Sequence, residues 1–527
     1  MTEDRDPTHL PFTGKKLGFS WEDAPHIDPS LHWRSQRADS IRSCAATVRK
    51  DISLIEAELN AVDDYTTALR AERARLVDFT ERCKPVVSPA QLLHPELLSH
   101  ICLLACSDWM EQRSSLDVAR SHPWIFSRVC ASWRSAAIST PRLWNTLCFF
   151  KTPGSVWSPS HTAYLTSTII SRTKNTPLTV HIRHSFTTAP CFEALKLLLG
   201  TSSRWVNATF LLKGPDWESN LSHFHLIRHK LPMLRNLSLI DVGGSGTTLR
   251  DPALYDVFWN APQLREIQIN GLHSTVFRLP WTQITSLALS SAYKENHGDP
   301  DILDVIRHLT NILDLEIRSS TIVIPSDATP IALPLLRRLR VFEEPTILDI
   351  LILPSLQSLY VVVEDTLPCR MITSMVTRSS QPPLKKLSVS PLDLFDDEDI
   401  ISLLRLVPQL SHLYIDAADD RPLALLTLDA ANSTEVLLPC LKYIQFEDSS
   451  SIQPCIDTIL DFLESRCAIG AEQADRKLKH AAFRIPCGSF SNPSRSHRLQ
   501  KLTDAGLDFH EHLMFYPQDA DGPEEWW

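Results

Sequence analysis

Three histidines, His223, His225 and His229, lie close enough in sequence to share one helical region, a spacing that could place imidazoles around a metal ion. A zinc hydrolase of the His-Glu-x-x-His type also needs a glutamate beside the first histidine, where it acts as the general base. No glutamate is adjacent to these histidines, so we interpret them as surface or packing residues. The sequence therefore predicts no metal site.

A glycine cluster, VGGSGTT at 242–248, has the composition of a loop that could hold a phosphate or present a serine nucleophile. It lacks the Gly-Lys-Ser/Thr of a phosphate loop and the Gly-x-Ser-x-Gly of a serine hydrolase. Because it follows a segment with strand-like alternation, we interpret it as an ordinary loop. No other acid, base or nucleophile set has a recognisable spacing, so we expect neither catalysis nor a cofactor.

The twelve cysteines are scattered without any Cys-x-x-Cys pair, and Cys102 and Cys106 lie in an apolar, helix-like run. We therefore expect buried thiols rather than a metal site or a disulfide framework, which suits a reducing compartment. The first residues have no apolar signal core, and no apolar run approaches the length that spans a membrane. We expect a cytoplasmic or nuclear protein that does not bind a membrane.

The charge and the length limit the class of protein further. The formal net charge is −10, whereas nucleic-acid binding requires a basic surface for the phosphates. A hydrophobic content of 43% supplies ample core material, and 527 residues exceed what one compact core holds. We expect two or more structural units, or an elongated repeat, whose partners are proteins rather than nucleic acid.

One short phrase recurs from Pro232 onward: proline, any residue, leucine, two residues, an aliphatic, one residue, another apolar residue. Nine copies begin roughly 20 to 31 residues apart, close to the period of about 20–29 residues of leucine-rich repeats. Two copies have threonine in place of proline. The copies read PMLRNLSL from Pro232, PQLREIQI from Pro262, TQITSLAL from Thr282, TNILDLEI from Thr310, PLLRRLRV from Pro334, PSLQSLYV from Pro354, PPLKKLSV from Pro382, PQLSHLYI from Pro408 and PCLKYIQF from Pro439.

The last positions of each phrase alternate as a strand does, so the two final apolar side chains face inward and their neighbours face outward. Segments between copies, such as DPALYDVFW at 251–259 and DEDIISLLRLV at 397–407, have helix-like apolar spacing. One strand–helix unit cannot bury its apolar face alone, whereas stacked units share a continuous core. The pattern predicts an α/β solenoid.

This pattern resembles the leucine-rich repeat family over roughly residues 176–510, with HRLQKLTDAGLDF at 497–509 as a final partial copy. The resemblance implies a solenoid in which parallel strands line one face. The Asn or Cys that usually follows the strand is missing here and the copy lengths vary, so we expect an irregular arc. The tail at 511–527 is acidic, and we expect it to be mobile.

In such repeats, the side chains that flank the inner strand positions line the face where a target protein binds. By register, this face passes from polar and acidic to basic and then aromatic. Arginine and tyrosine are residue types that often anchor interfaces. We therefore predict that a protein target contacts Arg338, Arg340, Tyr360, Lys386, Tyr414 and Tyr443.

Ahead of the repeats, residues 1–37 have no periodicity, and we expect them to be a disordered arm. From 38 to 84, apolar residues recur at every seventh position, and a second stripe at Ala45, Ile52 and Leu59 turns polar further on. This pattern predicts a long helix, which Pro85 and Pro89 would end. Two interpretations stay open: self-association as a coiled coil through 38–84, or one helix that packs on its own chain.

Residues 88–148 form another helical segment with four distinctive phrases. They read Leu93-His94-Pro95-Glu96, Leu97-Leu98-Ser99-His100-Ile101, Val129-Cys130-Ala131-Ser132-Trp133-Arg134 and Pro141-Arg142-Leu143-Trp144. These phrases resemble the F-box family, whose members carry Leu-Pro-x-Glu, Leu-Leu-x-x-Ile, Val-Cys-x-x-Trp-Arg and Pro-x-Leu-Trp in this order. His94 stands where the family most often has its first proline, and a polar insert at about 107–121 lengthens the gap between helices.

This resemblance implies a role rather than a reaction, because F-box proteins bind the Skp adaptor of cullin-RING ubiquitin ligases while their repeats hold the substrate. We expect a substrate-recognition subunit without enzymatic activity. The alternative is a leucine-rich repeat scaffold for protein interactions, in which the helical segment is only a cap. Val129 and Trp133 are also suited to an internal core. The adaptor contacts that the resemblance implies are Leu93, Pro95, Leu97, Leu98, Ile101, Val129 and Trp133.

Overall fold

The computed structural model divides the chain into two compact units, Met1–Leu98 and Ser99–Trp527. The division falls inside helix α2 (Pro95–Ser107). The structure describes residues 15–20, 22, 36–87, 93–107, 122–150, 159–183, 192–212, 223–241, 256–272, 277–290, 302–319, 322, 324–363, 368–390, 397–417, 421–428, 436–448, 456–467, 477–484, 490 and 492–510.

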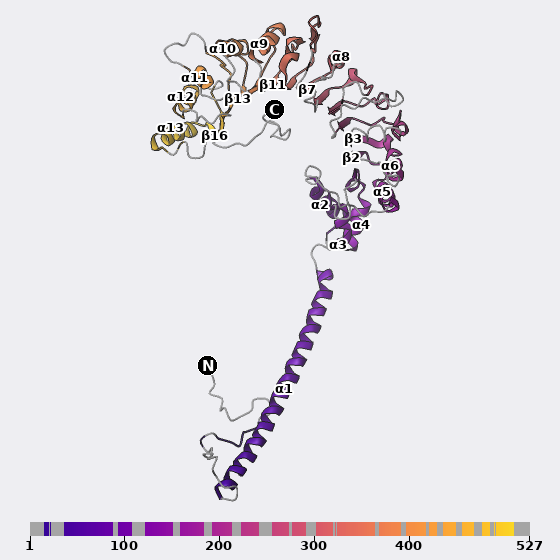
Figure 1. Cartoon of the computed structure of the whole chain (residues 1–527), viewed down its shortest axis with the longest axis vertical. Coiled ribbons are helices and arrows are strands. Elements are labelled where there is room, and N and C mark those ends of the chain that lie inside the picture. Colours follow the sequence, from indigo (N-terminus) through magenta and orange to yellow (C-terminus); the bar gives the residue numbers. More distant parts are fainter. Residues whose placement is uncertain are drawn as a thin grey trace. The chain divides into compact units, whose positions relative to one another are not determined.

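The first unit contains one long helix, α1 (Gln36–Val87), of 52 residues (Figure 1). It confirms the helix expected over 38–84 but continues through Pro85, which lies in its last turn. The last residue of the helix is Val87, two positions ahead of Pro89 in the sequence. The stripe of seventh-position and companion apolar residues is exposed along much of this helix, at Ile52, Ile55, Leu59, Leu69 and Leu76.

Part of the arm that we expected to be disordered is bound to α1. The backbone amides of Gly18 and Phe19 donate hydrogen bonds to the two carboxylate oxygens of Asp51, at 2.9 and 2.6 Å. Asp51 is buried, and a Cβ on Gly18 would lie only 3.3 Å from Cγ2 of Thr47. The expectation of disorder over 1–37 is therefore wrong for residues 15–20, because a helix carboxylate satisfies two backbone donors there. Residues 1–14 and 23–35 lie outside the described part.

The second unit begins with short helices around a small core. After α2 come α3 (His122–Val129), α4 (Ala131–Ser139) and the 3₁₀ turn η4 (Pro141–Leu143), while most of the polar insert lies outside the described residues. The indole N–H of Trp144 donates to the Ala137 carbonyl at 2.8 Å. The core of these helices consists of Cys102, Phe126, Ala137, Leu143 and Trp144.

The rest of this unit is built on fourteen parallel strands, each paired with the next along the sheet (Figure 1). All nine copies of the recurring phrase begin a strand at their fifth residue, so the expected solenoid-like sheet is confirmed. A separate pair, β8 (Ile331–Ala332) and β10 (Leu351–Ile352), forms a small second sheet. The main strands are β1 (Thr146–Phe150), β2 (Leu178–Arg183), β3 (Trp205–Leu212), β4 (Asn236–Asp241), β5 (Glu266–Asn270), β6 (Ser286–Ser290), β7 (Asp314–Ser319), β9 (Arg338–Glu343), β11 (Ser358–Val363), β12 (Lys386–Ser390), β13 (His412–Ala417), β14 (Tyr443–Asp448), β15 (His480–Arg484) and β16 (Asp508–His510).

The sheet starts earlier than the expected boundary at residue 176. Strand β1 pairs with β2 in parallel from Thr146, and helix α5 (Pro159–Thr173) lies between them in sequence. Neither element contains the proline–leucine phrase, so the pattern did not reveal them. Leu147 is nevertheless buried in the same core as the later strands, which makes β1 the first rung of the sheet.

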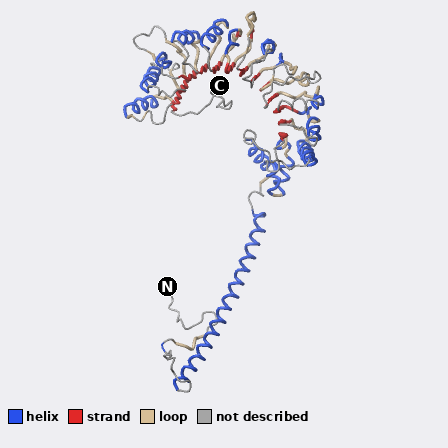
Figure 2. Tube along the Cα trace, in the orientation of Figure 1, coloured by secondary structure: helices blue, strands red, loops and turns tan. Residues whose placement is uncertain are grey.

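Helices and 3₁₀ turns connect the strands and lie on the outer side of the curve that the strands line (Figure 2). Each strand buries alternate aliphatic side chains, such as Leu315 and Ile317 of β7. One continuous apolar core runs from Leu147 to Leu507, and each buried aliphatic contributes about 1.5–3 kcal/mol before chain entropy is subtracted. The connecting elements are α6 (Phe192–Leu199), η6 (Ser202–Arg204), η7 (His225–Ile227), η9 (Trp281–Gln283), α8 (Ile302–Arg307), η10 (Pro345–Asp349), α9 (Pro368–Arg378), α10 (Asp397–Leu406), α11 (Arg421–Leu426), α12 (Ile456–Cys467) and α13 (Pro493–Asp504).

The buried side chain of Arg466 links α12 to the chain around α11 and ahead of β14 by hydrogen bonds. The Arg466 guanidinium, at the end of α12, donates to the carbonyls of Leu426, Leu437 and Leu438 at 2.6 to 3.1 Å. Burial lowers the pKa of Arg466 to about 10, so the side chain stays charged at neutral pH. Its fork of donors satisfies backbone carbonyls at the end of α11 and shortly before β14.

Within the part of the chain that the structure describes, no helix combines the length and the apolar character needed to cross a bilayer.

The contact between the arm and α1 gives a first prediction. Asp51→Ala removes the acceptors for the amides of Gly18 and Phe19, so the arm should leave the helix. Limited trypsin digestion followed by mass spectrometry should then show faster cleavage after Lys15 and Lys16 than in the wild type. Asp63→Ala, an exposed carboxylate on the same helix, serves as the control and should leave the cleavage rate unchanged. Equal rates in Asp51→Ala and the wild type would contradict the contact.

Candidate functional site

Helix α2 carries an exposed apolar stripe. Leu97, Ile101 and Leu104 are 54%, 38% and 60% exposed, and their spacing of four and three residues places them on one face. The other face is buried, because Leu98 and Cys102 are at most 1% exposed. A short helix that presents three large aliphatic side chains to solvent is suited to a hydrophobic groove on another protein.

The structure corrects one residue of the expected adaptor-contact set. Leu98 is inside, so it holds the helix in place and offers no surface to a partner. Leu104, which was not in that set, is the most exposed aliphatic of α2. Pro95 is exposed and Leu93 is half-buried just ahead of the helix. The helical spacing of the apolar residues alone could not show which of the two faces of α2 would be buried against the rest of the chain.

The two remaining residues of that set have different surroundings. Val129, at the end of α3, is exposed, as is Ile125 one turn earlier. Trp133 is half-buried against the small helical core, with its ring 6.0 Å from that of Phe126. Trp133 is therefore placed as a packing residue and Val129 as a surface residue.

The outward side chains of the main sheet form two continuous rows. Strand pairing places the first outward residue of each strand opposite that of the next, and the residues two positions on form a second row. This register is the one expected from the recurring phrase. The first row is Thr146, Thr179, Asn207, Asn236, Glu266, Ser286, Asp314, Arg338, Ser358, Lys386, His412, Tyr443, His480 and Asp508.

The N-terminal part of this face is a groove lined mainly by amide and hydroxyl groups, together with the carboxylate of Glu266, and it has a volume of about 910 Å³. Its side chains bond to one another across strands: Asn207 donates to Thr179 at 3.0 Å, and Ser238 donates to Gln268 at 3.0 Å. The groove ends at the charged side chains of β7 and β9. Amide and hydroxyl groups in such rows can donate to and accept from a peptide backbone.

The charged part of the face is internally paired. Arg338 contacts Asp314 at 2.7 Å, and Arg340 contacts Glu316 at 2.7 Å. Arg318 also contacts Glu316 at 2.7 Å, and its guanidinium lies 3.7 Å from the centre of the Phe342 ring. Three arginines thus face two carboxylates, so this patch keeps a positive charge.

Two of the predicted target-binding residues are not open to a partner. Tyr360 and Tyr414 are only 4% and 8% exposed, and Ser388, which lies between them in the second row, is fully buried. The Tyr360 ring lies 5.2 Å from that of Phe342. The prediction that these tyrosines present a binding surface is therefore wrong, because both side chains are buried.

Next to them, Lys386, His412 and Tyr443 are half-buried neighbours in the first row. The rings of His412 and Tyr443 stack at 4.2 Å with an interplanar angle of 9°. Burial lowers the pKa of His412 to about 4, and the charges of Lys386 and Lys442 act in the same direction. Burial, with Arg338 nearby, also lowers the pKa of Lys386.

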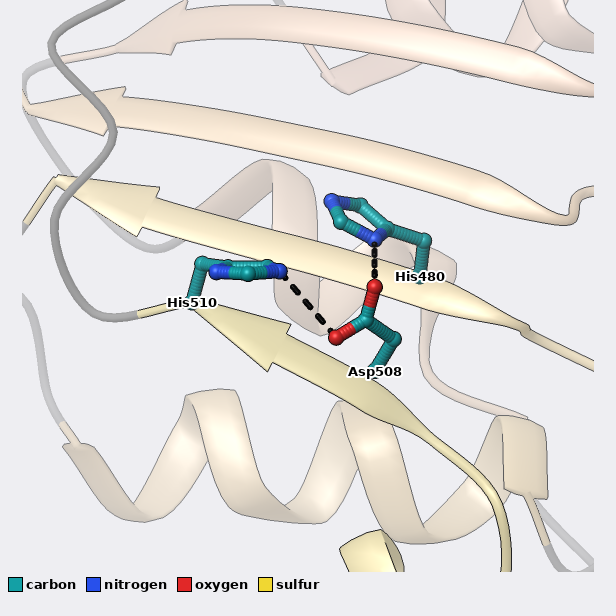
Figure 3. A group of neighbouring side chains, drawn as sticks. All are labelled: His480, Asp508 and His510. Carbon is teal, nitrogen blue, oxygen red and sulfur yellow. Dashed lines mark hydrogen bonds and ion pairs between the residues drawn. The ribbon is translucent and has the colours of Figure 1, made fainter.

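The C-terminal end of the face brings together a group that the sequence did not reveal. Asp508 of β16 contacts Nδ1 of His480 at 2.8 Å and Nε2 of His510 at 3.1 Å (Figure 3). The hydrogen bond from His480 lowers the pKa of Asp508, and burial lowers that of His480. By contrast, among the histidines examined from sequence, His223 is half-buried while His225 and His229 are exposed. The glycine cluster at 242–248 lies outside the described residues.

No family model and no curated protein matches the chain. Among solved structures, one chain of the yeast complex of Rad7 and Elc1 is similar, with 13% sequence identity and a TM-score of 0.36. The match covers 84% of this chain and 98% of that chain. A TM-score this low does not establish a common fold, so neither fold nor function follows from this similarity.

The buried imidazole of His412 gives a prediction about pH. Its folded pKa of about 4 lies below the ordinary value of 6.5, so the unfolded chain binds more protons between these two values. The contribution of His412 to the free energy of unfolding is therefore fully present above about pH 6.5, and it decreases as the pH falls toward about 4. His412→Phe keeps a ring against Tyr443 but cannot titrate, so its urea midpoint should fall less than that of the wild type across this range.

The control for this measurement is His308→Gln, which removes an exposed histidine after α8 and should leave the wild-type pH profile intact. An identical loss of stability in His412→Phe and the wild type would show that His412 does not carry this dependence.

Proposed function

We propose that this chain is the substrate-recognition subunit of a ubiquitin ligase of the Skp–cullin–F-box type. The observation that carries the proposal is the exposed stripe of α2, at Leu97, Ile101 and Leu104, within the phrases that resemble an F-box. A stripe of this kind suits the hydrophobic groove of a Skp adaptor. Pro95 and Val129, which are also exposed, are further adaptor contacts in this proposal.

The target would bind the outward rows of the sheet. In this proposal, the strands and the segments that connect them are leucine-rich repeats. The open and half-buried residues Arg338, Arg340, Lys386 and Tyr443 remain the proposed contacts. The positive charge left by the arginines of β7 and β9, with Lys386 nearby, favours an acidic segment of the target. Arginine and tyrosine offer the broad, low-entropy contacts that anchor protein interfaces.

In this proposal, the chain performs no chemistry itself. It would hold a target near an enzyme that the adaptor brings, and the gain in rate would come from proximity. The proposed compartment is the cytoplasm or the nucleus, where such ligases act. A scaffold that uses the same rows without any adaptor is the alternative, and binding of the adaptor separates the two.

The long helix adds a second proposed contact, between two copies of this chain. Ile52, Ile55 and Leu59 follow the four–three spacing of a coiled-coil seam and are exposed on α1. Burial of these side chains against the same residues of a partner helix would remove them from water. A paired receptor would present two target-binding faces and gain avidity.

Adaptor binding is tested with purified full-length chain and purified Skp adaptor, by isothermal titration calorimetry. The double variant Leu97→Asp, Ile101→Asp places two charges in the apolar stripe and should weaken binding at least about 30-fold, the effect of losing about 2 kcal/mol. Both side chains are exposed, so the fold should survive, which circular dichroism checks.

Leu197→Asp is the matched control, because Leu197 is an exposed leucine on α6, away from the F-box-like phrases. It should bind the adaptor like the wild type. If the wild type does not bind the adaptor, the ligase proposal is wrong and the scaffold is favoured.

Self-association is tested by sedimentation equilibrium of the full-length chain over a range of concentrations. The wild type should form dimers, and Ile52→Asp with Leu59→Asp should be monomeric, since charges in the seam oppose its burial. Lys50→Ser, a change of an exposed residue on the side of the helix away from the seam, should dimerise as the wild type does. A wild-type chain that remains monomeric at the highest concentration would refute the seam.

A further inference from the structure

The last two strands of the sheet bring two imidazoles and one carboxylate to a single point. His480 is the first residue of β15, and Asp508 and His510 are the first and third residues of β16, on the same outward face. One ligand atom from each of the three side chains lies within 4.8 Å of the other two. Figure 3 shows both imidazoles turned toward the carboxylate, each facing a different oxygen.

These distances match what one metal ion requires. Zinc binds imidazole nitrogen at about 2.0–2.1 Å and carboxylate oxygen at about 2.0–2.2 Å, so two ligands of a tetrahedral ion lie about 3.3 Å apart. The separations of 2.8 and 3.1 Å between Asp508 and the two histidines are slightly shorter. The two separations that involve Asp508 therefore need only a small increase to fit an ion.

We propose that His480, Asp508 and His510 bind a divalent transition-metal ion, preferentially Zn²⁺. Two imidazoles and one carboxylate are the donor set of zinc sites that keep a further position for water or another ligand. The hard ions Mg²⁺ and Ca²⁺ prefer oxygen ligands and are not expected to bind to two imidazole nitrogens. This metal-site proposal does not depend on the proposed ligase function, and it is tested separately.

The position in the fold gives the ion a structural use. β16 is an edge strand of three residues, and it is joined to β15 by only three residue pairs. Such a short strand is the weakest rung of a parallel sheet, because few hydrogen bonds and few side chains hold it. A metal bound by one side chain of β15 and two of β16 would fasten the end of the sheet without further core.

The ligand residues also lie in line with the proposed target-binding rows. His480 follows Tyr443 in the first row, and their rings are 6.2 Å apart. The remaining coordination position of the ion would thus be on the face where a target is proposed to lie. Water is the simplest occupant of that position.

The test uses full-length chain that has been treated with a chelator and dialysed. Zinc titrated in competition with a chromophoric chelator should show one site per chain in the wild type. His510→Ala and Asp508→Asn alter the two exposed ligands, so the fold should be preserved, and both should abolish that site. Zinc should also raise the thermal midpoint of the wild type but not that of His510→Ala.

Cobalt provides an independent signature, because Co²⁺ in a site of low coordination number gives visible absorption bands that the free aqueous ion lacks at comparable strength. The bands should form with the wild type and with the control His308→Ala, an exposed histidine elsewhere in the unit. If wild type and His510→Ala bind the same amount of zinc, or if the wild type binds none, the three residues form only a hydrogen-bonded cluster and the proposal is overturned.

Discussion

Parallel pairing that keeps equivalent residues of successive strands opposite one another, with one register shift at the start of the β2–β3 pair, is the constraint on which the second unit depends. Each strand must bury alternate side chains against the helices, as Leu315 and Ile317 do, and a shift by one residue would turn these aliphatics to solvent. The leucine or isoleucine at the third place of each phrase is buried just ahead of the strand, as Leu336 and Leu356 are. Burial thus sets the register, and the register decides which residues become neighbours on the face of the sheet that the helices do not cover.

This uncovered face acquires its chemistry from these neighbours, because adjacent strands lie about 4.8 Å apart and equivalent side chains touch. Carboxylates of β7 meet guanidiniums of β9, the ring of His412 stacks on that of Tyr443, and β15 and β16 bring imidazoles to Asp508. The contacts that cross between strands join residues roughly 24 to 31 positions apart in sequence. This arrangement separates the two proposed binding functions. The rows present polar, charged and aromatic groups to a target, whereas the exposed stripe of α2, which is proposed to bind the adaptor, lies on a helix outside the sheet.

The repeating parts of this structure could be predicted from the sequence. The phrase predicted nine strands and their outward residues, and the seven-residue period predicted α1. It missed β1 and α5, which pack into the core without the phrase, and it could not foresee that Asp51 would hold Gly18. The predictions for Leu98 and Tyr360 were wrong because the helical period and the strand register show only which residues share a face. Whether that face is buried depends on tertiary packing. The cluster at His480 was missed because His480 lies on β15, whereas Asp508 and His510 lie on β16, 28 and 30 positions further along the sequence.

The most direct test of this division of tasks is hydrogen–deuterium exchange of the full-length chain, alone and with saturating purified Skp adaptor. Ordered backbone slows exchange, so the strands of the sheet should be protected in both states. Added adaptor should slow exchange in the segment containing α2 and leave the strands that carry Arg338, Lys386 and Tyr443 unchanged. Adaptor-dependent protection on those strands, with none in α2, would contradict the account.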